Sequence, residues 1–137
     1  MQLINSSSKT TKTKCSYHTN RKMSDETYKL KREVMSLIYE AKELLNNNMA
    51  RVTIRITDCH KPNVLGTAGM GRHIIWIPAK TLNSKHLREV VYHELCHALW
   101  ATPHIETCKL MSSSVNKRAL SKSTVQKLFL KYAKGNS

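Results

Sequence analysis

Hydrophobic residues follow a helical period between residues 25 and 46. Seven apolar side chains recur at intervals of three and four: Leu30, Val34, Leu37, Ile38, Ala41, Leu44 and Leu45. Ser24 is placed as a helix cap, and Asp25 and Glu26 suit the positive end of the helix dipole. A run of three asparagines ends the pattern. The sequence therefore predicts an amphipathic scaffold helix over about residues 25–46.

Alternating apolar and polar residues then predict a short sheet. Val52, Ile54 and Ile56 alternate with polar residues, which is typical of a half-buried strand. His73–Ile77 is expected to form a second strand that is apolar on both faces. Between the two, residues 61–71 contain GTAGMG and are expected to form a loop. Its glycines favour a turn or bulge over a phosphate cradle, because no P-loop lysine and no helix follow.

Two more helices complete the pattern. Ser84 can cap a helix that runs to about Ala101, and it should end there because the residue before Pro103 is disfavoured in helical conformation. After a turn over residues 103–116, a last helix is predicted over about 121–134. Its apolar positions are Val125, Leu128, Phe129 and Tyr132. This order of elements indicates the α+β class, with one domain over residues 24–137.

Residues 1–23 differ in composition from that domain. They are polar, rich in Ser, Thr and Lys, and without a period, so we expect a disordered basic tail. The chain has no apolar run near the length of a membrane span and no apolar core of a secretory signal, which predicts a cytoplasmic protein. Its four cysteines form no C-x-x-C pair and are expected to be reduced thiols.

Basic residues are concentrated at the two ends of the chain. The protein has 23 Lys and Arg against 9 Asp and Glu, and residues 1–24 and 112–137 contain no acid at all. Such ends favour anionic partners, nucleic acid first. The alternative is a solvated surface that only keeps the protein soluble. No basic stretch interleaved with aromatic residues decides between them.

The sequence LREVVYHELCH, residues 87–97, contains His93, Glu94 and His97 in the spacing H-E-x-x-H. Residues four apart on a helix stand about one turn above each other, so the two imidazoles can bind one metal ion. Glu94 lies about 100° further round the helix, where it can take a proton from a metal-bound water. The pattern predicts a hydrolytic zinc centre. The alternative is a chance pattern on a core-packed helix.

A catalytic zinc ion usually takes three protein ligands and leaves one position for water. Downstream of His97 the candidates are His104, Glu106 and Cys108, because residues 109–137 contain no Asp, Glu, His or Cys. His104 is favoured, since the proline before it turns the chain back toward the helix, and the other two remain alternatives. Four donors upstream have no spacing argument behind them: Cys59, His60, His73 and His86.

The run HELCHALWATPH, followed by CKLMSS, resembles the metzincin metalloprotease pattern H-E-x-x-H-x-x-G-x-x-H with a later Met-turn. The resemblance implies that zinc is bound by His93, His97 and His104, that Glu94 is the general base and that Met111 is the Met-turn residue below the metal. The spacing is most similar to that of small bacterial metzincins of the snapalysin type. The same run also resembles SprT-like and WLM-type proteases, which act on proteins crosslinked to DNA.

Two features depart from the metzincin pattern. Trp100 stands where the family has a glycine that permits a sharp turn, and His104 comes one residue late. The strand His73–Ile77 matches the edge strand on which zincins hold an extended peptide, although a buried strand between two helices fits its pattern equally well.

These observations together predict a small zincin-like α+β core and, as its function, zinc-dependent hydrolysis of peptide bonds in a protein or peptide substrate. Two alternatives remain open. One is a non-catalytic, zinc-stabilised module that binds nucleic acid through its basic ends. The other is a protease with the same chemistry that acts on DNA-bound proteins. The oligomeric state and the substrate are not predicted.

Overall fold

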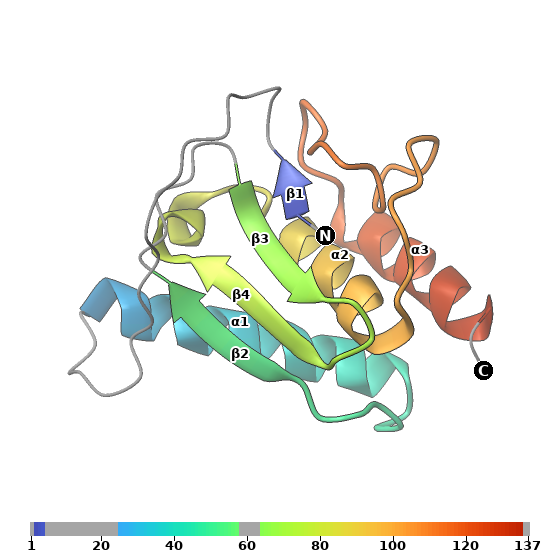
Figure 1. The fold of residues 1–137 in the computed structure, drawn as a ribbon, viewed down its shortest axis with the longest axis horizontal. Helices are drawn as coiled ribbons and strands as arrows, with labels where there is room; N and C mark the ends of the chain where they lie inside the picture. The colour runs from blue at the N-terminus through green and yellow to red at the C-terminus, as the bar shows by residue number, and fades with distance from the viewer. Residues whose placement is uncertain (1, 5–24, 58–63, 136–137) are drawn as a thin grey trace.

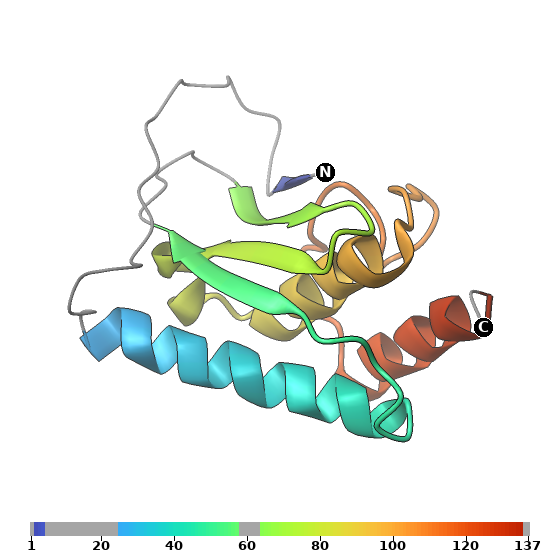
Figure 2. The same ribbon diagram turned by 60° about the horizontal axis from the view of Figure 1, so that its bottom comes forward.

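The computed structural model describes residues 2–4, 25–57 and 64–135 of the 137-residue chain. The elements follow in the order β1 (Gln2–Ile4), α1 (Asp25–Leu44), β2 (Thr53–Thr57), β3 (Val64–Gly69), β4 (Ile74–Pro78), the 3-10 helix η1 (Ala79–Asn83), α2 (Leu87–Trp100) and α3 (Lys122–Gly135). The sheet lies on one side of the molecule and the helices α1 and α2 cover the same face of it (Figures 1 and 2). The predicted α+β class is confirmed.

The described strands form one mixed sheet in the order β1-β3-β4-β2. β2 runs parallel to β4, with Thr53 opposite Ile74. β3 is antiparallel to β4, and β1 is antiparallel to β3, with Leu3 opposite Gly66. β2 therefore lies at one edge, and β4 is internal. This differs from the edge position considered for His73–Ile77. It also differs from a strand between two helices, because the helices cover one face only and Ile74 and Trp76 are half-buried while Ile75 and Ile77 are buried.

The three predicted helices and the two predicted strands are present. α1 ends two residues before the predicted end, at Leu44. α2 begins at Leu87 and its N-cap is His86, so the predicted cap Ser84 is wrong. The hydroxyl of Ser84 instead accepts a hydrogen bond from the backbone N–H of His86 at 3.1 Å, ahead of the helix. None of the described helices is both long and apolar enough to cross a lipid bilayer.

The predicted loop over residues 61–71 is wrong for Val64–Gly69, which form strand β3. The reason is the close approach of α2: a Cβ at Gly66 would lie 2.9 Å from Cγ1 of Val90. Glycine at this position permits the contact but has low strand propensity, so the strand carries little sequence signal. Gly71 does form the expected turn, with φ of 69°. Residues 58–63 lie outside the described part.

The expected tail over residues 1–23 lies mostly outside the described residues, as does the proposed cap Ser24. Within the tail, Gln2–Ile4 form β1, which the sequence pattern does not predict.

The core lies between the sheet and the helices. Its fully buried side chains include Leu30 and Val34 on α1, Ile75 and Ile77 on β4, Val90, Tyr92 and Leu95 on α2, and Val125 and Phe129 on α3. The rings of Tyr92 and Phe129 meet edge to face, with centroids 4.9 Å apart, and join α2 to α3. Because α2 touches the sheet and both other long helices, it is held on all sides and provides a rigid support for its side chains.

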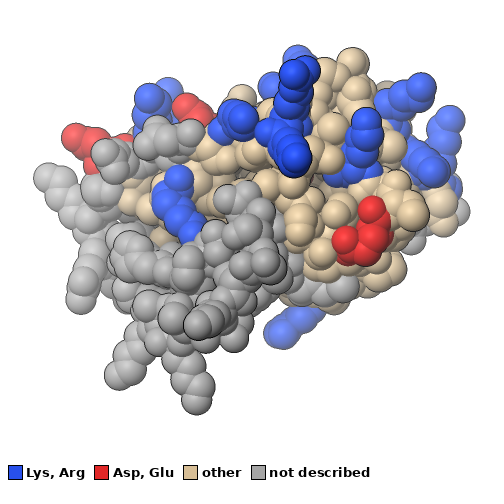
Figure 3. All heavy atoms as spheres, turned by 90° about the horizontal axis from the view of Figure 1, so that it is seen from above, with Lys and Arg blue, Asp and Glu red and all other residues tan. Residues whose placement is uncertain are grey.

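Lys and Arg outnumber Asp and Glu on the described surface. In the view of Figure 3 the basic side chains, in blue, are spread widely rather than gathered in one patch. On α3 the lysines at 122, 127, 131 and 134 are all exposed, as the helix pattern predicts.

Candidate metal centre

Three imidazoles converge at the C-terminal half of α2. Nε2 of His93 lies 2.9 Å from Nε2 of His97 and 3.3 Å from Nε2 of His104. The first two side chains come from one face of α2, and the third comes from the segment after the helix. Among the described residues, His93, His97 and His104 form a group of metal-ligating side chains that lie close enough together to hold one metal ion.

The other ring nitrogens are held by backbone carbonyls. Nδ1 of His93 donates to the carbonyl of Leu110 at 2.7 Å, and Nδ1 of His97 donates to the carbonyl of Thr102. A carbonyl oxygen can only accept, so both Nδ1 atoms carry the proton and both Nε2 atoms present a lone pair. Lone pairs that face each other repel, unless a proton or a cation lies between them. The arrangement matches the outer contacts by which proteins orient metal-binding histidines.

The distances also suit a tetrahedral metal. With zinc–nitrogen bonds of about 2.0–2.1 Å, two ligand nitrogens stand roughly 3.3–3.4 Å apart. The 3.3 Å between His93 and His104 falls in this range, while the 2.9 Å between His93 and His97 requires a small outward turn of one ring. The donor set therefore fits a divalent metal of the zinc type.

Burial keeps two of these histidines neutral. His93 and His97 are almost completely inaccessible, and burial lowers the pKa of His93 to about 3 and that of His97 to about 4. Both are thus unprotonated near neutral pH, which is the form that binds metals. His104 is only half-buried, and burial lowers its pKa as well. The open side of the centre is therefore the side of His104.

Glu94 is fully buried beside the histidines. Neither of its carboxylate oxygens has a hydrogen-bond partner among the described residues, and burial raises its pKa well above the usual range. Strand β3 passes close to it, because a Cβ on Gly66 would lie 3.1 Å from its Oε2. An unpaired buried carboxyl group costs free energy, so its retention here points to a partner outside the protein, such as water or a cation.

The end of α2 sets the path to His104. The helix continues through Trp100, and Ala101 takes the left-handed conformation with φ of 52° and ψ of 31°. The N–H of Ala101 donates to the carbonyl of His97 at 3.0 Å, which is the single bond of the αL motif, and the N–H of Thr102 donates to the carbonyl of Cys96 at 3.3 Å. The sharp turn thus lies one residue beyond Trp100, and the late arrival of His104 is explained by this shift.

The turn between β3 and β4 covers the same end of α2. The N–H of Gly71 donates to the carbonyl of His97 at 2.8 Å, and the N–H of His73 donates to Ala98 at 3.1 Å. The bond from His73 satisfies the carbonyl of Ala98, which lies in the last turn of the helix, while the carbonyl of His97 accepts from both Gly71 and Ala101. His73, considered above as a donor to a metal, instead has its place in this turn.

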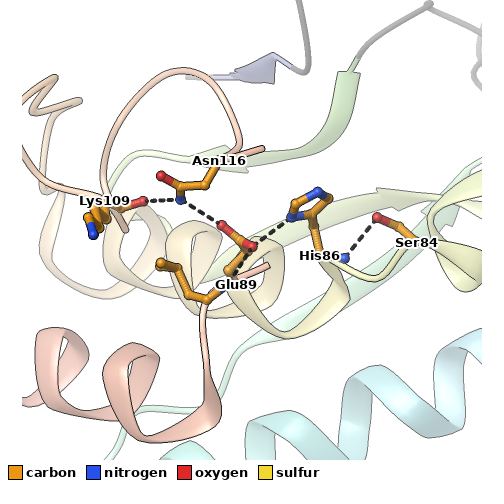
Figure 4. A network of polar contacts seen from close by, with 6 residues as sticks. Ser84, His86, Glu89, Lys109 and Asn116 are labelled. Carbon is orange, nitrogen blue, oxygen red and sulfur yellow. Dashed lines mark hydrogen bonds and ion pairs between the residues drawn. The ribbon is translucent and has the colours of Figure 1, made fainter. Parts of the chain in front are cut away.

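Glu89 organises the segment that follows the centre (Figure 4). Its buried carboxylate accepts hydrogen bonds from His86 Nδ1 at 2.7 Å, from Asn116 Nδ2 at 3.2 Å and from the N–H of Leu120 at 3.2 Å. His86 is therefore engaged away from the three converging imidazoles. The segment is tied to the first turn of α2.

Asn116 extends this network toward His93. Its Nδ2 also donates to the carbonyl of Lys109 at 2.9 Å, next to the Leu110 carbonyl that receives His93 Nδ1. Sequence reasoning missed this role for Glu89 and Asn116. A usable signal existed for Glu89 alone, which stands one helical turn before His93.

The alternative ligands lie elsewhere. Glu106 is exposed and accepts a hydrogen bond from the N–H of Ser113 at 3.1 Å. Cys108 is a free thiol, half-buried against Tyr132, and does not belong to the converging group. Met111 is fully buried directly after Leu110, and its carbonyl accepts from the N–H of Ile105 at 2.8 Å. Cys59 and His60 lie outside the described residues.

The side chain of Tyr92 joins α2 to α1. Its hydroxyl donates to Glu40 on α1 at 2.6 Å and thus has a structural partner.

Comparison of the chain with protein-family models, with curated proteins and with solved structures found no match.

Proposed function

We propose that this protein is a zinc-dependent metallopeptidase that hydrolyses peptide bonds. The observation that supports it best is the convergence of three imidazole Nε2 atoms, together with a fully buried carboxyl group on the same helix that has no hydrogen-bond partner among the described residues. The resemblance of HELCHALWATPH to the metzincin pattern supports the same function. In that pattern the third histidine follows the turn residue by three positions, as His104 follows Ala101 here.

The residues of the centre have distinct roles in this proposal. His93, His97 and His104 hold the zinc ion, with the carbonyls of Leu110 and Thr102 fixing the first two rings. A bound zinc ion supplies Lewis acidity, which polarises a carbonyl and lowers the pKa of water. Met111 takes the place of the Met-turn residue.

Glu94 is the general base of this proposal. The positive charge of a bound zinc ion would favour the ionised form of Glu94 against the effect of burial on its pKa. Glu94 accepts a proton from the attacking water and passes it to the nitrogen of the departing amine, so that one C–N bond breaks and one C–O bond forms. Burial excludes bulk water from this carboxyl group and keeps the transferred proton local.

Strand β3 supports a peptide as the substrate. It passes next to Glu94, and its outer side already pairs with an extended segment, because β1 lies antiparallel to it with Leu3 opposite Gly66. A substrate strand that paired in this way would lie against α2, as β1 does, and gain main-chain hydrogen bonds. It would take the position of β1, so β3 replaces β4 as the strand proposed to hold substrate.

The test is the substitution Glu94→Gln, which keeps size and removes the base. The wild-type protein should cleave a mixed protein substrate, lose activity with a chelator and regain it with zinc. The variant should keep its zinc and its fold and cleave roughly 10²-fold more slowly. Glu43→Gln, the same change at an exposed position of α1, should leave the rate unchanged.

The substrate set should include DNA-bound protein. If the zinc-loaded wild type cleaves nothing in it, or if Glu94→Gln cleaves as fast as the wild type, the peptidase proposal fails. A zinc-stabilised module without catalysis is then the better account.

A further inference from the structure

Helix α1 carries an exposed aromatic stripe on the side away from α2. Tyr28, Met35 and Tyr39 are 58%, 36% and 61% exposed, and they are the exposed large hydrophobic residues of the described chain. At about 100° per residue they fall within about 40° of one another around the helix. The two tyrosines stand about 16 Å apart along the axis, at about 1.5 Å per residue. Exposed apolar surface gathered in this way indicates a binding surface rather than a chance exposure.

Two adjoining hollows follow this stripe, with volumes of about 640 and 610 Å³. The first is lined by Tyr28, Lys31, Arg32, Met35, Ser36 and Tyr39. The second shares Lys31, Met35 and Tyr39 with it and continues over Lys42 and Arg51 to strand β2. We call the two together the α1 groove. Each is large enough to receive a planar ring system.

The α1 groove is lined by four cationic side chains and by no carboxylate. The cations are Lys31, Arg32, Lys42 and Arg51. None of them forms an ion pair with another residue of the described chain. Their charge is thus available to a partner.

The carboxylates in the middle of α1 face elsewhere. Glu40 is bound by the hydroxyl of Tyr92 at 2.6 Å and by Arg88 and Lys122 at 3.3 Å each. Glu33 lines a separate hollow with Arg88. Neither Glu33 nor Glu40 therefore lines the α1 groove.

We propose that the α1 groove binds single-stranded nucleic acid. Unpaired bases would stack on Tyr28 and Tyr39, while Lys31, Arg32 and Lys42 would neutralise the phosphates between them. A duplex hides its base faces and an acidic protein has no need of two exposed rings beside the cations, so this combination favours a single strand. The groove lies in the folded domain and not at the basic ends considered from sequence, and the inference is independent of the proposed peptidase function.

The experiment measures binding of a labelled 20-nucleotide oligothymidylate to the full chain by fluorescence anisotropy. The double variant Tyr28→Ala with Tyr39→Ala should weaken binding at least roughly fivefold, since stacking on an aromatic side chain contributes strongly for each base. The double variant with Phe at both positions should bind like the wild type, because the ring faces remain. Thermal unfolding of each variant checks that the exposed substitutions leave the fold intact.

A matched pair of charge variants separates the groove from general charge. The double variant Lys31→Gln with Lys42→Gln should weaken binding. It should also reduce the slope of log affinity against log salt concentration by about 1.4, because each phosphate contact on a single strand contributes roughly 0.7 to that slope. Lys127→Gln with Lys131→Gln removes the same charge from α3 and should have a much smaller effect.

Three outcomes would overturn the inference. In the first, the two lysine double variants weaken binding equally. In the second, the tyrosine-to-alanine double variant binds as tightly as the wild type. In the third, the protein binds a duplex, polyglutamate or anionic vesicles more tightly than the single strand. The first two leave only general charge, and the third assigns the surface to another partner.

Discussion

Asn116 donates a hydrogen bond to the carboxylate of Glu89 at 3.2 Å and, from the same nitrogen, a second one to the carbonyl of Lys109 at 2.9 Å. The side chain thus fixes the backbone beside Leu110, whose carbonyl orients His93. Two residues that do not touch the converging nitrogens therefore determine where one of them points.

We expect Asn116→Ala to lower zinc affinity by roughly tenfold, at the lower end of what loss of an outer contact costs a metal site. The free energy of unfolding should also fall by about 1–2 kcal/mol, because the buried Glu89 loses a hydrogen-bond partner. Competition with a zinc-binding dye and thermal unfolding measure the two effects. Asn48→Ala, at an exposed position after α1, is the control and should change neither.

The third ligand can be assigned by metal analysis. The purified protein should contain one zinc per chain, and His93→Ala or His97→Ala should abolish it. His104→Ala should weaken zinc binding strongly, whereas Cys108→Ser should leave it unchanged, because the thiol lies outside the converging group. The reverse ranking of the last two variants would indicate a site with two histidines and one cysteine.

Ala101 is under backbone strain that glycine would relieve. A non-glycine residue in the left-handed region destabilises the fold by about 1–2 kcal/mol. Glycine removes this strain, but ordering glycine costs more conformational entropy, so the net gain in stability is smaller. We expect Ala101→Gly to stabilise the fold by about 0.5–1 kcal/mol in urea unfolding. Ala98→Gly, in the buried interior of α2, should destabilise it by about 1 kcal/mol or more. A loss of stability in Ala101→Gly would contradict the turn at the end of α2.

Gly66 should not tolerate a side chain. The added Cβ of Gly66→Ala would lie 2.9 Å from Cγ1 of Val90, and such overpacking costs about 1–3 kcal/mol. Val90→Ala removes that atom, so the double variant should lose less stability than the sum of the two single ones. Gly135→Ala, which has open space around it, is the matched control. Simple additivity at 66 and 90 would show that the strand and helix are not in contact there.

The parts of the fold that the sequence predicts are those with a strong local period. α1 and α2 carry long apolar patterns, and the H-E-x-x-H spacing follows from the geometry of one helix turn. β3 was missed because its composition reflects contact with α2, and a contact between distant segments leaves no period. The same holds for Glu89 and Asn116, which lie far apart in sequence and meet only when the segment after α2 folds back.

The turn formed by Gly71 and His73 has a further consequence. By its composition it would be the fastest segment of the sheet to exchange its amide hydrogens with solvent. Its two amides instead donate to the carbonyls of His97 and Ala98, so their exchange requires that the turn and the end of α2 separate. Protection of these amides should therefore rise and fall together with that of the helix. We therefore expect the hairpin and the helix that bears the histidines to open as one cooperative unit.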